Sequence, residues 1–472
     1  MSRAQDVLEQ AATTAQQFRT FDQDQTDDIV RAVYLRALDR RVELAKMAQE
    51  ETGIGVWQHK VIKNVIAAQL VYEHIKNQRT VGVIAEDDPA GIVEVAWPVG
   101  PILVYIPVTN PTSTTIFKIL ISMKTRNPLI ISPHQAARRC IIAAAETLYE
   151  AALDAGAPEH CIQWLNKPSP ETLDEIMNDR RLALILATGT NSLVNKAQRS
   201  GSPTIGVGPG NVPVYIGATA DVPFAVESII ESKLLDNGSI CASEQAVVVK
   251  LEEADQVIEE FERHGGYFLS PDEIEKVGRI AYDRERRIMS ATVVGQSAQR
   301  IAESAGIEVP EGTVLLLARL EGVGPDYPLS AEILAPILAF YVEEDFDGSI
   351  RRCTEVTGFG GAGHTAVVYS NNDERIEYFS QVINAGRILV NMPSTQGALG
   401  GIYNSLDPSF TLSCGSDGGN ITMDNITTRH LLNTHRITRR RPNPRWMRFD
   451  KDDYLNQSIP AEEIERQYNQ NF

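Results

Sequence analysis

The chain has 472 residues, 43% of them hydrophobic and 22% charged, a composition typical of a soluble globular protein with roughly two or three domains. Its formal net charge of −18 disfavours nonspecific binding to nucleic acid or to an anionic membrane. Five cysteines without close pairs argue against a disulfide framework and a zinc site, and no apolar run reaches the roughly 18 residues of a membrane span. We expect a cytoplasmic protein that uses no metal and binds neither nucleic acid nor membrane.

The first 79 residues are predicted to be helical. Apolar residues recur at helical spacing over residues 29–38 and again over residues 61–72, and the Thr-Asp-Asp run at 26–28 indicates a helix start. Beyond Gly91 the pattern changes to two short apolar runs, residues 92–96 and 102–106, which predict strands.

A regular alternation of helices and strands follows. The predicted helices cover residues 112–124, 136–155, 171–178, 192–198 and 222–234, and the predicted strands cover residues 128–132, 162–165, 182–187 and 214–216. This alternation predicts a parallel sheet with helices on both faces, in which ligands bind beyond the carboxyl ends of the strands. The turn at 188–190 and the glycine-rich segment 206–211 lie where a cofactor could approach the backbone, or they are plain turns.

A second α/β unit is predicted from residue 249 to about residue 420. Its expected helices cover residues 254–263 and 271–283, and its expected strands cover residues 314–317, 337–341 and 366–369, the last after a glycine-rich turn at 358–364. The tail beyond residue 420 carries three consecutive arginines and two prolines, and we expect it to form an extended arm.

Cys241 stands out among the cysteines. It lies among small residues, after an Asp-Asn-Gly turn signal and before a β-branched run that predicts a buried strand. This placement suits a nucleophile, although a free cysteine is also commonly a buried packing residue. Cys140 and Cys353 lie in apolar helical runs and are expected to pack, which leaves Cys414 as the rival thiol.

Several segments together resemble the CoA-acylating branch of the aldehyde dehydrogenase superfamily, in particular the aldehyde dehydrogenase half of bifunctional aldehyde-alcohol dehydrogenases. The matching segments are residues 107–114, 117–118, 124–127, 132–134, 187–189, 206–211, 236–245, 363–365 and 414–416. The resemblance implies an α/β, aldehyde dehydrogenase-like fold. It comprises a Rossmann-type parallel-sheet NAD(P)-binding domain (1–234), an α/β catalytic domain with Cys241 (235–420), and a C-terminal oligomerisation arm and tail (421–472). A stand-alone homodimer or homotetramer is expected.

The resemblance also implies the reaction. Cys241 would be the nucleophile, and the Asn110 side chain with the backbone N–H of Cys241 would form the oxyanion hole. Without the resemblance, a turn residue before Pro111 is the favoured interpretation of Asn110. Hydrolytic relatives carry a general-base glutamate in the segment corresponding to residues 206–211, and this chain has no carboxylate there. The acyl group is therefore expected to pass from the Cys241 thioester to CoA rather than to water.

The remaining site residues also follow from the resemblance. Glu332 corresponds to the glutamate that binds the nicotinamide ribose, although it is equally a surface carboxylate. Further cofactor contacts are expected at Ser132, Pro133, His134, Thr188, Gly189 and Gly208. Two arginines at 138 and 139 would accept a 2′-phosphate or form a solvated helix face, so the cofactor is NAD or NADP, with NAD preferred.

Thr109 and His364 are expected near the substrate or CoA, although His364 is equally a buried hydrogen-bonding histidine. The default substrate is acetaldehyde, with succinate semialdehyde and sulfoacetaldehyde as alternatives. An anionic substrate would need a positive residue in the pocket, such as Arg199 or Arg387. A hydrolytic aldehyde dehydrogenase and a non-catalytic structural subunit are the other functions considered.

Overall fold

The computed structural model describes residues 2–470, which divide into two compact units. The first unit contains the residues up to Gln78 and Pro98–Leu432, and the second contains Arg79–Trp97 and the segment from Asn433 onwards. Within residues 2–470, no helix is long and apolar enough to cross a membrane.

The first unit begins with a layer of helices. These are α1 (Arg3–Phe18), α2 (Gln23–Asp39), α3 (Arg41–Thr52), α4 (Trp57–Val65), a π-helical turn (Ile66–Leu70) and α5 (Val71–Ile75). The predicted start of α2 at residues 26–28 is wrong by one turn. Asp22 caps the helix instead, since its side chain accepts from the Gln25 N–H while Gln25 bonds back to the Asp22 N–H.

A five-stranded parallel sheet follows, in the order β5-β4-β3-β6-β7. Its strands are β3 (Ile102–Ile106), β4 (Leu129–Pro133), β5 (Ile162–Trp164), β6 (Leu184–Thr188) and β7 (Thr204–Val207). Its helices are α6 (Pro111–Lys124), α7 (Arg138–Asp154), α8 (Pro170–Met177) and α9 (Asn191–Gln198), with a short 3₁₀ turn at Gln135–Ala137. The first strand in sequence lies in the middle, which is the strand order of a dinucleotide-binding sheet.

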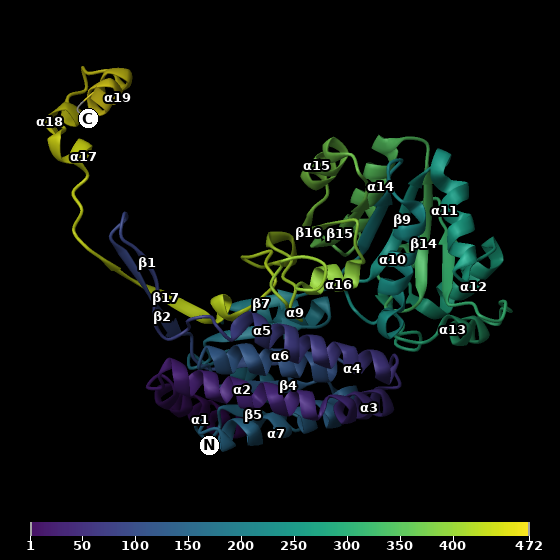
Figure 1. Cartoon of the computed structure of the whole chain (residues 1–472), viewed down its shortest axis with the longest axis horizontal. Helices are drawn as coiled ribbons and strands as arrows, with labels where there is room; N and C mark the ends of the chain where they lie inside the picture. Colours follow the sequence, from purple (N-terminus) through teal and green to yellow (C-terminus); the bar gives the residue numbers. More distant parts are fainter. Residues whose placement is uncertain (1, 471–472) are drawn as a thin grey trace. The chain divides into compact units, whose positions relative to one another are not determined.

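Both faces of this sheet are covered, so its strands are apolar on both sides. In β3, Ile102, Val104 and Ile106 join the core formed with α6 and α7. The alternate residues Leu103 and Tyr105 join a second core with α1, α8 and α9. Figure 1 shows α2, α6 and α7 beside the strands of this sheet.

The second sheet of this unit has seven parallel strands in the order β10-β13-β14-β9-β8-β15-β16. The strands are β8 (Val212–Ile216), β9 (Glu244–Lys250), β10 (Gly266–Phe268), β13 (Leu315–Arg319), β14 (Ile337–Glu343), β15 (Gly363–Tyr369) and β16 (Ala385–Val390). The helices are α10 (Val222–Leu234), α11 (Leu251–Arg263), α12 (Pro271–Ala281), α13 (Ala298–Ala305), α14 (Phe346–Gly358), α15 (Asp373–Val382) and α16 (Ser394–Leu399).

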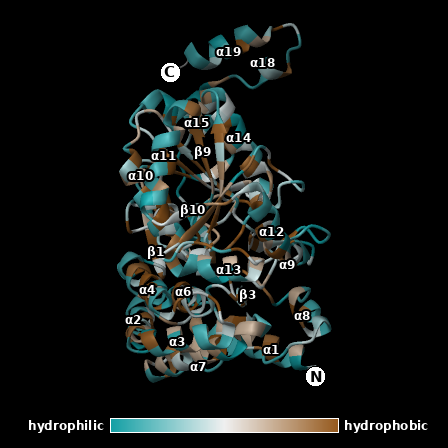
Figure 2. Cartoon of the chain, turned by 90° about the vertical axis from the view of Figure 1, so that its right-hand side faces the viewer, coloured by the Kyte–Doolittle hydropathy of each residue, from teal (hydrophilic) through white to brown (hydrophobic). Residues whose placement is uncertain are grey.

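The seven-stranded sheet is also buried on both faces. One face packs against α10 and α11, and the other against α12, α13, α14 and α15. Figure 2 shows hydrophobic strand residues inside this region and hydrophilic residues on the outer sides of α10 and α11. A small antiparallel pair, β11 (Tyr282–Asp283) and β12 (Ile288–Met289), and short 3₁₀ turns at Leu235–Gly238, Pro328–Ser330, Ser416–Gly418 and Thr428–Leu431 complete the unit.

The second unit contains a three-stranded sheet in the order β1-β2-β17. It consists of β1 (Gly82–Asp87), β2 (Ile92–Pro98) and β17 (Leu432–Thr438), followed by α17 (Pro444–Arg448), α18 (Asp452–Leu455) and α19 (Ala461–Gln470). The tail is extended from β17 as far as the start of α17. Its later segments form three short helices, so the expected extended arm does not continue through them.

Two local predictions need correction. Residues 204–207 form strand β7, whereas the sequence suggested only a glycine-rich turn from residue 206. His364 is the second residue of β15 rather than the end of a turn, because pairing with β16 begins at Gly363.

Candidate active site

Cys241 lies in a tight loop between α10 and β9. The loop contains two residues in the left-handed backbone region, Asp236 and Asn237, both with φ of +54°. Asp and Asn tolerate this conformation better than other side chains with a Cβ. Cys241 is half-buried, whereas the other four cysteines, which are also free thiols, are buried.

Burial raises the pKa of the Cys241 thiol to about 12, and the charge of Glu332 acts in the same direction. The thiol is therefore protonated at neutral pH in these surroundings. Its conversion to the nucleophilic thiolate depends on a change in local charge or on proton removal.

The Asn110 side chain points toward the Cys241 loop. Asn110 precedes α6, but its side chain makes no capping bond, so it is not serving the helix. Its Nδ2 donates to the Ser239 carbonyl oxygen at 3.3 Å and to Thr109 Oγ1 at 3.1 Å, while its Oδ1 accepts from Lys63 Nζ at 2.6 Å. These bonds link Asn110 to Thr109 and to Ser239, which is two positions before Cys241.

Beneath this loop lies a buried charge cluster that sequence reasoning missed. Asp236 is fully buried and pairs with two fully buried lysines of α4, Lys60 at 2.8 Å and Lys63 at a shorter distance. Asp236 also accepts hydrogen bonds from the Val56 N–H at 2.7 Å and from Ser239 Oγ at 2.8 Å. Burial would raise the pKa of Asp236, but the two lysines outweigh it and hold the pKa below its usual value.

Gly210, Glu332 and His364 lie on another side of Cys241. A Cβ on Gly210 would fall 2.2 Å from the Cys241 carbonyl oxygen and 3.1 Å from the His364 ring, so this position requires glycine. The Gly210 N–H donates to Glu332 Oε1 at 2.7 Å, which brings a carboxylate to a segment that carries none in its sequence. Burial raises the pKa of Glu332 to about 7.

His364 is completely buried. Its Nδ1 pairs with Thr365 Oγ1 at 3.0 Å, and its Nε2 has no partner among the described residues. Burial, with a smaller contribution from Arg387, lowers the pKa of His364 well below its usual value, so the ring is neutral. His364 is therefore a buried hydrogen-bonding residue, and it also lies beside the Cys241 backbone.

The expected cofactor residues gather at the carboxyl edge of the five-stranded sheet. The strand register aligns Tyr105 of β3 with Ser132 and with Ala187, and Thr188 with Val207. The residues at or directly beyond these strand ends are Ser132, Pro133, Thr188, Gly189 and Gly208. Lys118 lies at the same edge. Its buried Nζ donates to the carbonyl oxygens of Tyr105 and Leu186 and to Thr188 Oγ1 at 2.9–3.1 Å.

His134 is exposed, and its ring serves a structural contact. Its Nδ1 accepts from the Ala136 N–H at 3.2 Å and so caps the 3₁₀ turn before α7. The two arginines that follow differ in exposure, with Arg138 half-buried and Arg139 exposed. The Glu51 carboxylate accepts from the backbone N–H groups of Arg139 and Cys140 at 2.8 and 2.7 Å.

Two arginines were expected to bind an anionic substrate. One of them is held by hydrogen bonds, and the other is exposed. Arg387 is buried, and its guanidinium donates to the carbonyl oxygens of His364, Ser413 and Met423. Arg199 is exposed at the end of α9. Neither presents a free cation to a buried pocket.

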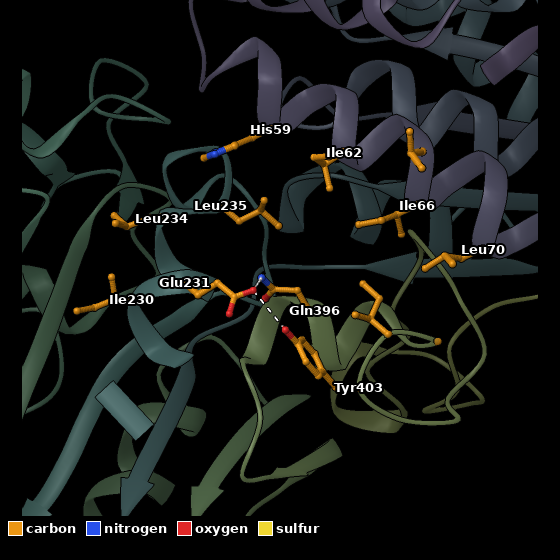
Figure 3. Close-up of a pocket in the computed structure, with 13 residues that line it drawn as sticks. His59, Ile62, Ile66, Leu70, Ile230, Glu231, Leu234, Leu235, Gln396 and Tyr403 are labelled. Carbon is orange, nitrogen blue, oxygen red and sulfur yellow. Dashed lines mark hydrogen bonds between the residues drawn. The ribbon is translucent and has the colours of Figure 1, made fainter. Parts of the chain in front are cut away.

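A largely apolar cavity of about 750 Å³ lies beside the Cys241 loop. Figure 3 shows its walls, which come from α4 and the π-helical turn, from the end of α10 and from the loop around Tyr403. Leu235, six residues before Cys241, lines it, as does His59, whose Nδ1 accepts from the Asp236 N–H at 2.9 Å. Glu231 is the charged lining residue, and Gln396 and Tyr403 donate to its Oε1 at 3.1 and 3.4 Å.

Comparisons with known proteins agree with this architecture. Residues 2–406 match the sequence profile of the aldehyde dehydrogenase family. The chain is 42% identical over 459 residues to the bifunctional aldehyde-alcohol dehydrogenase AdhE of Escherichia coli K12, a match that covers 96% of this chain and 51% of that protein. The chain therefore spans about half the length of such relatives.

Two further similarities cover nearly the whole of both chains. The succinate-semialdehyde dehydrogenase (acetylating) of Clostridium kluyveri is 34% identical over 432 residues, which are 92% of this chain and 94% of that protein. The crystal structure of an acetylating aldehyde dehydrogenase from Geobacillus thermoglucosidasius superposes with a TM-score of 0.90 at 41% identity, covering 93% of this chain and 97% of that one. The chain belongs to the aldehyde dehydrogenase family, and its similarities lie with acylating members of that family.

Proposed function

We propose that this protein is a CoA-acylating aldehyde dehydrogenase, which reversibly converts an aldehyde, CoA and NAD(P)+ into acyl-CoA, NAD(P)H and a proton. The observation that carries the proposal is the half-buried Cys241 thiol in a rigid loop toward which the Asn110 amide points. The similarity to acetylating relatives supports the same class of reaction.

In the first step, the Cys241 thiolate attacks the aldehyde carbon and the carbonyl electron pair moves onto oxygen. The Asn110 Nδ2–H and the Cys241 backbone N–H would donate to this oxyanion. Asn110 is held through its Oδ1 by Lys63, and Cys241 lies three residues before β9. Negative charge on the substrate oxygen would draw the Asn110 Nδ2–H from its bonds to Thr109 Oγ1 and the Ser239 carbonyl oxygen.

The residues present fit a nicotinamide dinucleotide. The carboxyl edge of the five-stranded sheet has glycines at 189 and 208 that allow close backbone approach, and its strand order is that of a dinucleotide-binding fold. Ser132, Pro133, Thr188 and Gly189 would contact the cofactor, and Glu332 would bind its nicotinamide ribose. A bound nicotinamide would supply the hydride acceptor, and the tetrahedral carbon held on Cys241 would lose its hydride to become a thioester.

The acyl group then passes to CoA. The CoA thiolate attacks the thioester carbon, the bond to Cys241 Sγ breaks, and the Cys241 thiolate is restored. No general base comes from segment 206–211, which has no carboxylate. Glu332 comes from outside this segment and contacts it through the Gly210 N–H. Thr109 and His364 would lie on the substrate or CoA side of Cys241.

We propose a neutral short-chain aldehyde, with acetaldehyde as the default, as the substrate. Arg387 is engaged by backbone carbonyls and Arg199 is exposed, so neither favours an anion. Succinate semialdehyde stays the second candidate because of the Clostridium kluyveri relative.

We propose NAD as the preferred nucleotide. Glu51 of α3 accepts from backbone N–H groups at the start of α7, where it would repel a 2′-phosphate near the arginines at 138 and 139. The fold itself accommodates both NADP+ and a CoA ester. An engineered glycolyl-CoA reductase with NADP+ and a Rhodopseudomonas palustris propionaldehyde dehydrogenase with propionyl-CoA share it, each at 24% identity with a TM-score of 0.82.

We further propose that the second unit mediates a homodimer or homotetramer. In its three-stranded sheet β17 is an edge strand and carries the exposed Ile437, and edge strands can pair with another chain. Truncation before Arg439 should alter the oligomer measured by light scattering. A variant with an unchanged oligomer would argue against this role.

The decisive experiment is NADH formation from acetaldehyde with and without CoA, with the products identified by mass spectrometry. A CoA-dependent rate and acetyl-CoA as product are expected. Equal rates without CoA, with acetate as product, would favour a hydrolytic aldehyde dehydrogenase instead. A panel with succinate semialdehyde and sulfoacetaldehyde, each run with NAD and NADP, tests the substrate and the nucleotide.

A non-catalytic structural subunit is the alternative from another class. It predicts that a Cys241→Ser variant keeps every function of the protein. A Cys241→Ser variant that folds and assembles normally but has lost turnover would reject that alternative.

A further inference from the structure

The buried lysine Lys63 lies behind Asn110, the side-chain donor of the candidate oxyanion hole. It comes from α4 and is about 1% exposed. Its Nζ pairs with the Asp236 carboxylate, donates to Asn110 Oδ1 at 2.6 Å and donates to Ser239 Oγ at 3.3 Å. Lys63 is thus in direct contact both with the residue assigned as oxyanion donor and with the loop that carries the nucleophile.

We infer that Lys63 is a positioning residue, whose ammonium holds the Asn110 amide with Oδ1 turned away from the substrate and Nδ2–H turned toward the oxyanion. This inference rests on the proposed function and adds a residue to it. Lys63 would act through Asn110 and would not itself touch the substrate.

The need for such a residue follows from the chemistry of the amide group. An asparagine side chain presents an acceptor on one side and donors on the other, and the two orientations have nearly the same shape. Only the orientation that directs Nδ2–H at the substrate oxygen stabilises negative charge there. The reversed orientation would place an NH₂ group against the Lys63 ammonium, where two donors face each other without an acceptor.

The same contact strengthens the donor. A cation on Oδ1 draws electron density from the amide, which makes its N–H groups better donors in a site screened from water. The two bonds that Asn110 Nδ2 donates, to Thr109 Oγ1 and to the Ser239 carbonyl oxygen, are long at 3.1 and 3.3 Å. They would yield readily to an oxyanion.

Asp236 explains how a charged lysine is retained in this buried position. Its carboxylate bonds to both lysines, to Ser239 Oγ and to the Val56 N–H, so every group near it is satisfied. A Cβ on Gly55 would lie within 2 Å of Asp236 Oδ1, so the backbone of residue 55 closes over the carboxylate. Burial lowers the pKa of Lys63 to about 8 while Asp236 opposes the shift, which leaves Lys63 charged at neutral pH.

Lys60 offers a matched control in the same helix. It is as buried as Lys63 and pairs with the same carboxylate, but its second contact is the Thr109 carbonyl oxygen at 3.3 Å rather than the Asn110 side chain. Replacement of either lysine by methionine therefore removes one charge and one ion pair from the same cluster. Only the Lys63 replacement removes a contact to the Asn110 amide.

The test compares Lys63→Met and Lys60→Met, each alone and combined with Asn110→Ala. Removal of an oxyanion donor costs about 10²–10³ in kcat, so loss of its positioning should lower kcat by roughly 10- to 100-fold with KM changed less than about threefold. We expect a smaller effect for Lys60→Met. In the Asn110→Ala background, Lys63→Met should add less than about twofold, since residues that act as a unit are not additive.

Two results would overturn the inference: equal losses for the two lysine variants, or a full additional loss for Lys63→Met in the Asn110→Ala background. Thermal melts show whether each variant is folded. If a methionine variant does not fold, Lys63→Gln and Lys60→Gln replace the pair in the same comparison.

A second readout separates this inference from the proposed function. The burst of p-nitrophenol from p-nitrophenyl acetate reports acyl transfer to Cys241 through the same oxyanion hole, and it needs no aldehyde, nucleotide or CoA. Wild-type protein that forms no NADH with CoA and aldehyde would refute the proposed function. The burst would still decide on Lys63, since a burst slowed by Lys63→Met no more than by Lys60→Met refutes the positioning role.

Discussion

The two parallel sheets of the first unit contribute to the candidate site from opposite ends of their strands. In the five-stranded sheet the site residues end or follow a strand, as Asn110 does after β3 and Thr188 does in β6. In the seven-stranded sheet they precede or begin a strand, as Cys241 does before β9, Glu332 before β14 and His364 in β15. The rule that ligands bind beyond the carboxyl ends of parallel strands therefore predicts only one half of this site.

This difference divides the functions of the site, nucleotide binding and nucleophilic attack, between the two edges. The carboxyl edge of the five-stranded sheet offers helix N-termini and glycines, which suit a dinucleotide. The amino edge of the seven-stranded sheet offers a loop held by Asp236, which fixes the direction of a thiol. We therefore expect variants at the first edge to change the KM for the nucleotide and variants at the second to change kcat. Asn110 and Glu332 are exceptions. Asn110 lies at the first edge but points at Ser239 in the loop of the second. Glu332 precedes β14 at the second edge but is expected to bind the nicotinamide ribose.

Cys241→Ser should have the largest effect of any single replacement. A hydroxyl in this loop is a far weaker nucleophile than a thiolate, so CoA-dependent NADH formation should fall by roughly 10⁴-fold or more. Cys353→Ala is the matched control, because Cys353 is a buried packing residue of α14. Comparable losses in the two variants would place the nucleophile elsewhere.

Asn110→Ala should have the next largest effect. It removes one oxyanion donor without altering the nucleophile, so kcat should fall about 10²- to 10³-fold while the KM for NAD stays nearly constant. Steady-state kinetics with the nucleotide and the aldehyde varied separately distinguish the two constants. A change confined to the KM for NAD would make Asn110 an ordinary residue of the nucleotide edge.

The pattern of apolar runs predicted the regular part of the fold well. β3 was predicted with its observed bounds, and the helix ending at Lys124 was misplaced by one residue at its start. These elements are buried on both faces or strongly periodic, so local sequence determines them. Strand β7 was missed because it is four residues long and contains a glycine, and the three helices of the tail were missed because prolines and arginines obscure their periodicity.

The charge cluster under the Cys241 loop could not be predicted in the same way. A lysine in a helix normally faces solvent, and Asp236 has the sequence of a turn. Their contact joins residues more than 170 positions apart, which no local pattern reports. One feature of the sequence was related to it: Lys60 and Lys63 are three positions apart and so share one face of α4. The structure buries that face while Ile62 is half exposed, the reverse of an ordinary amphipathic helix.

The pH dependence of Cys241 alkylation gives the third prediction. Because burial raises the pKa of this thiol to about 12, it is protonated between pH 7 and 9, and the thiolate fraction increases with pH. The rate with iodoacetamide should therefore rise about tenfold per pH unit across this range. A rate that levels off above about pH 8.5, as for an unperturbed thiol, would contradict the expectation. NAD should shift the curve to lower pH, because the positive nicotinamide favours the thiolate.

Glu332→Gln tests whether an amino-edge residue can serve the nucleotide. The amide keeps the acceptor for the Gly210 N–H but loses the charge, so the KM for NAD should rise about tenfold, the value of a hydrogen bond to a charged group. The ratio of acetyl-CoA to acetate should stay unchanged. A fall in acetate formation with an unchanged KM for NAD would instead indicate that the carboxylate activates water, a role in the chemical step like that of the other residues at the second edge.

Thr188→Val should produce the smallest effect. It directly tests the division of function between the two sheet edges. Valine has nearly the same shape as threonine but removes the hydroxyl that accepts from Lys118 Nζ at 3.1 Å. Lys118 keeps its bonds to the carbonyl oxygens of Tyr105 and Leu186, so the edge should remain folded. Loss of one neutral acceptor corresponds to roughly a threefold to tenfold rise in the KM for NAD. Because the Thr188 hydroxyl bonds to Lys118 of the nucleotide edge, kcat and the p-nitrophenol burst should not change. A reduced burst would mean that the nucleotide edge also orders Cys241.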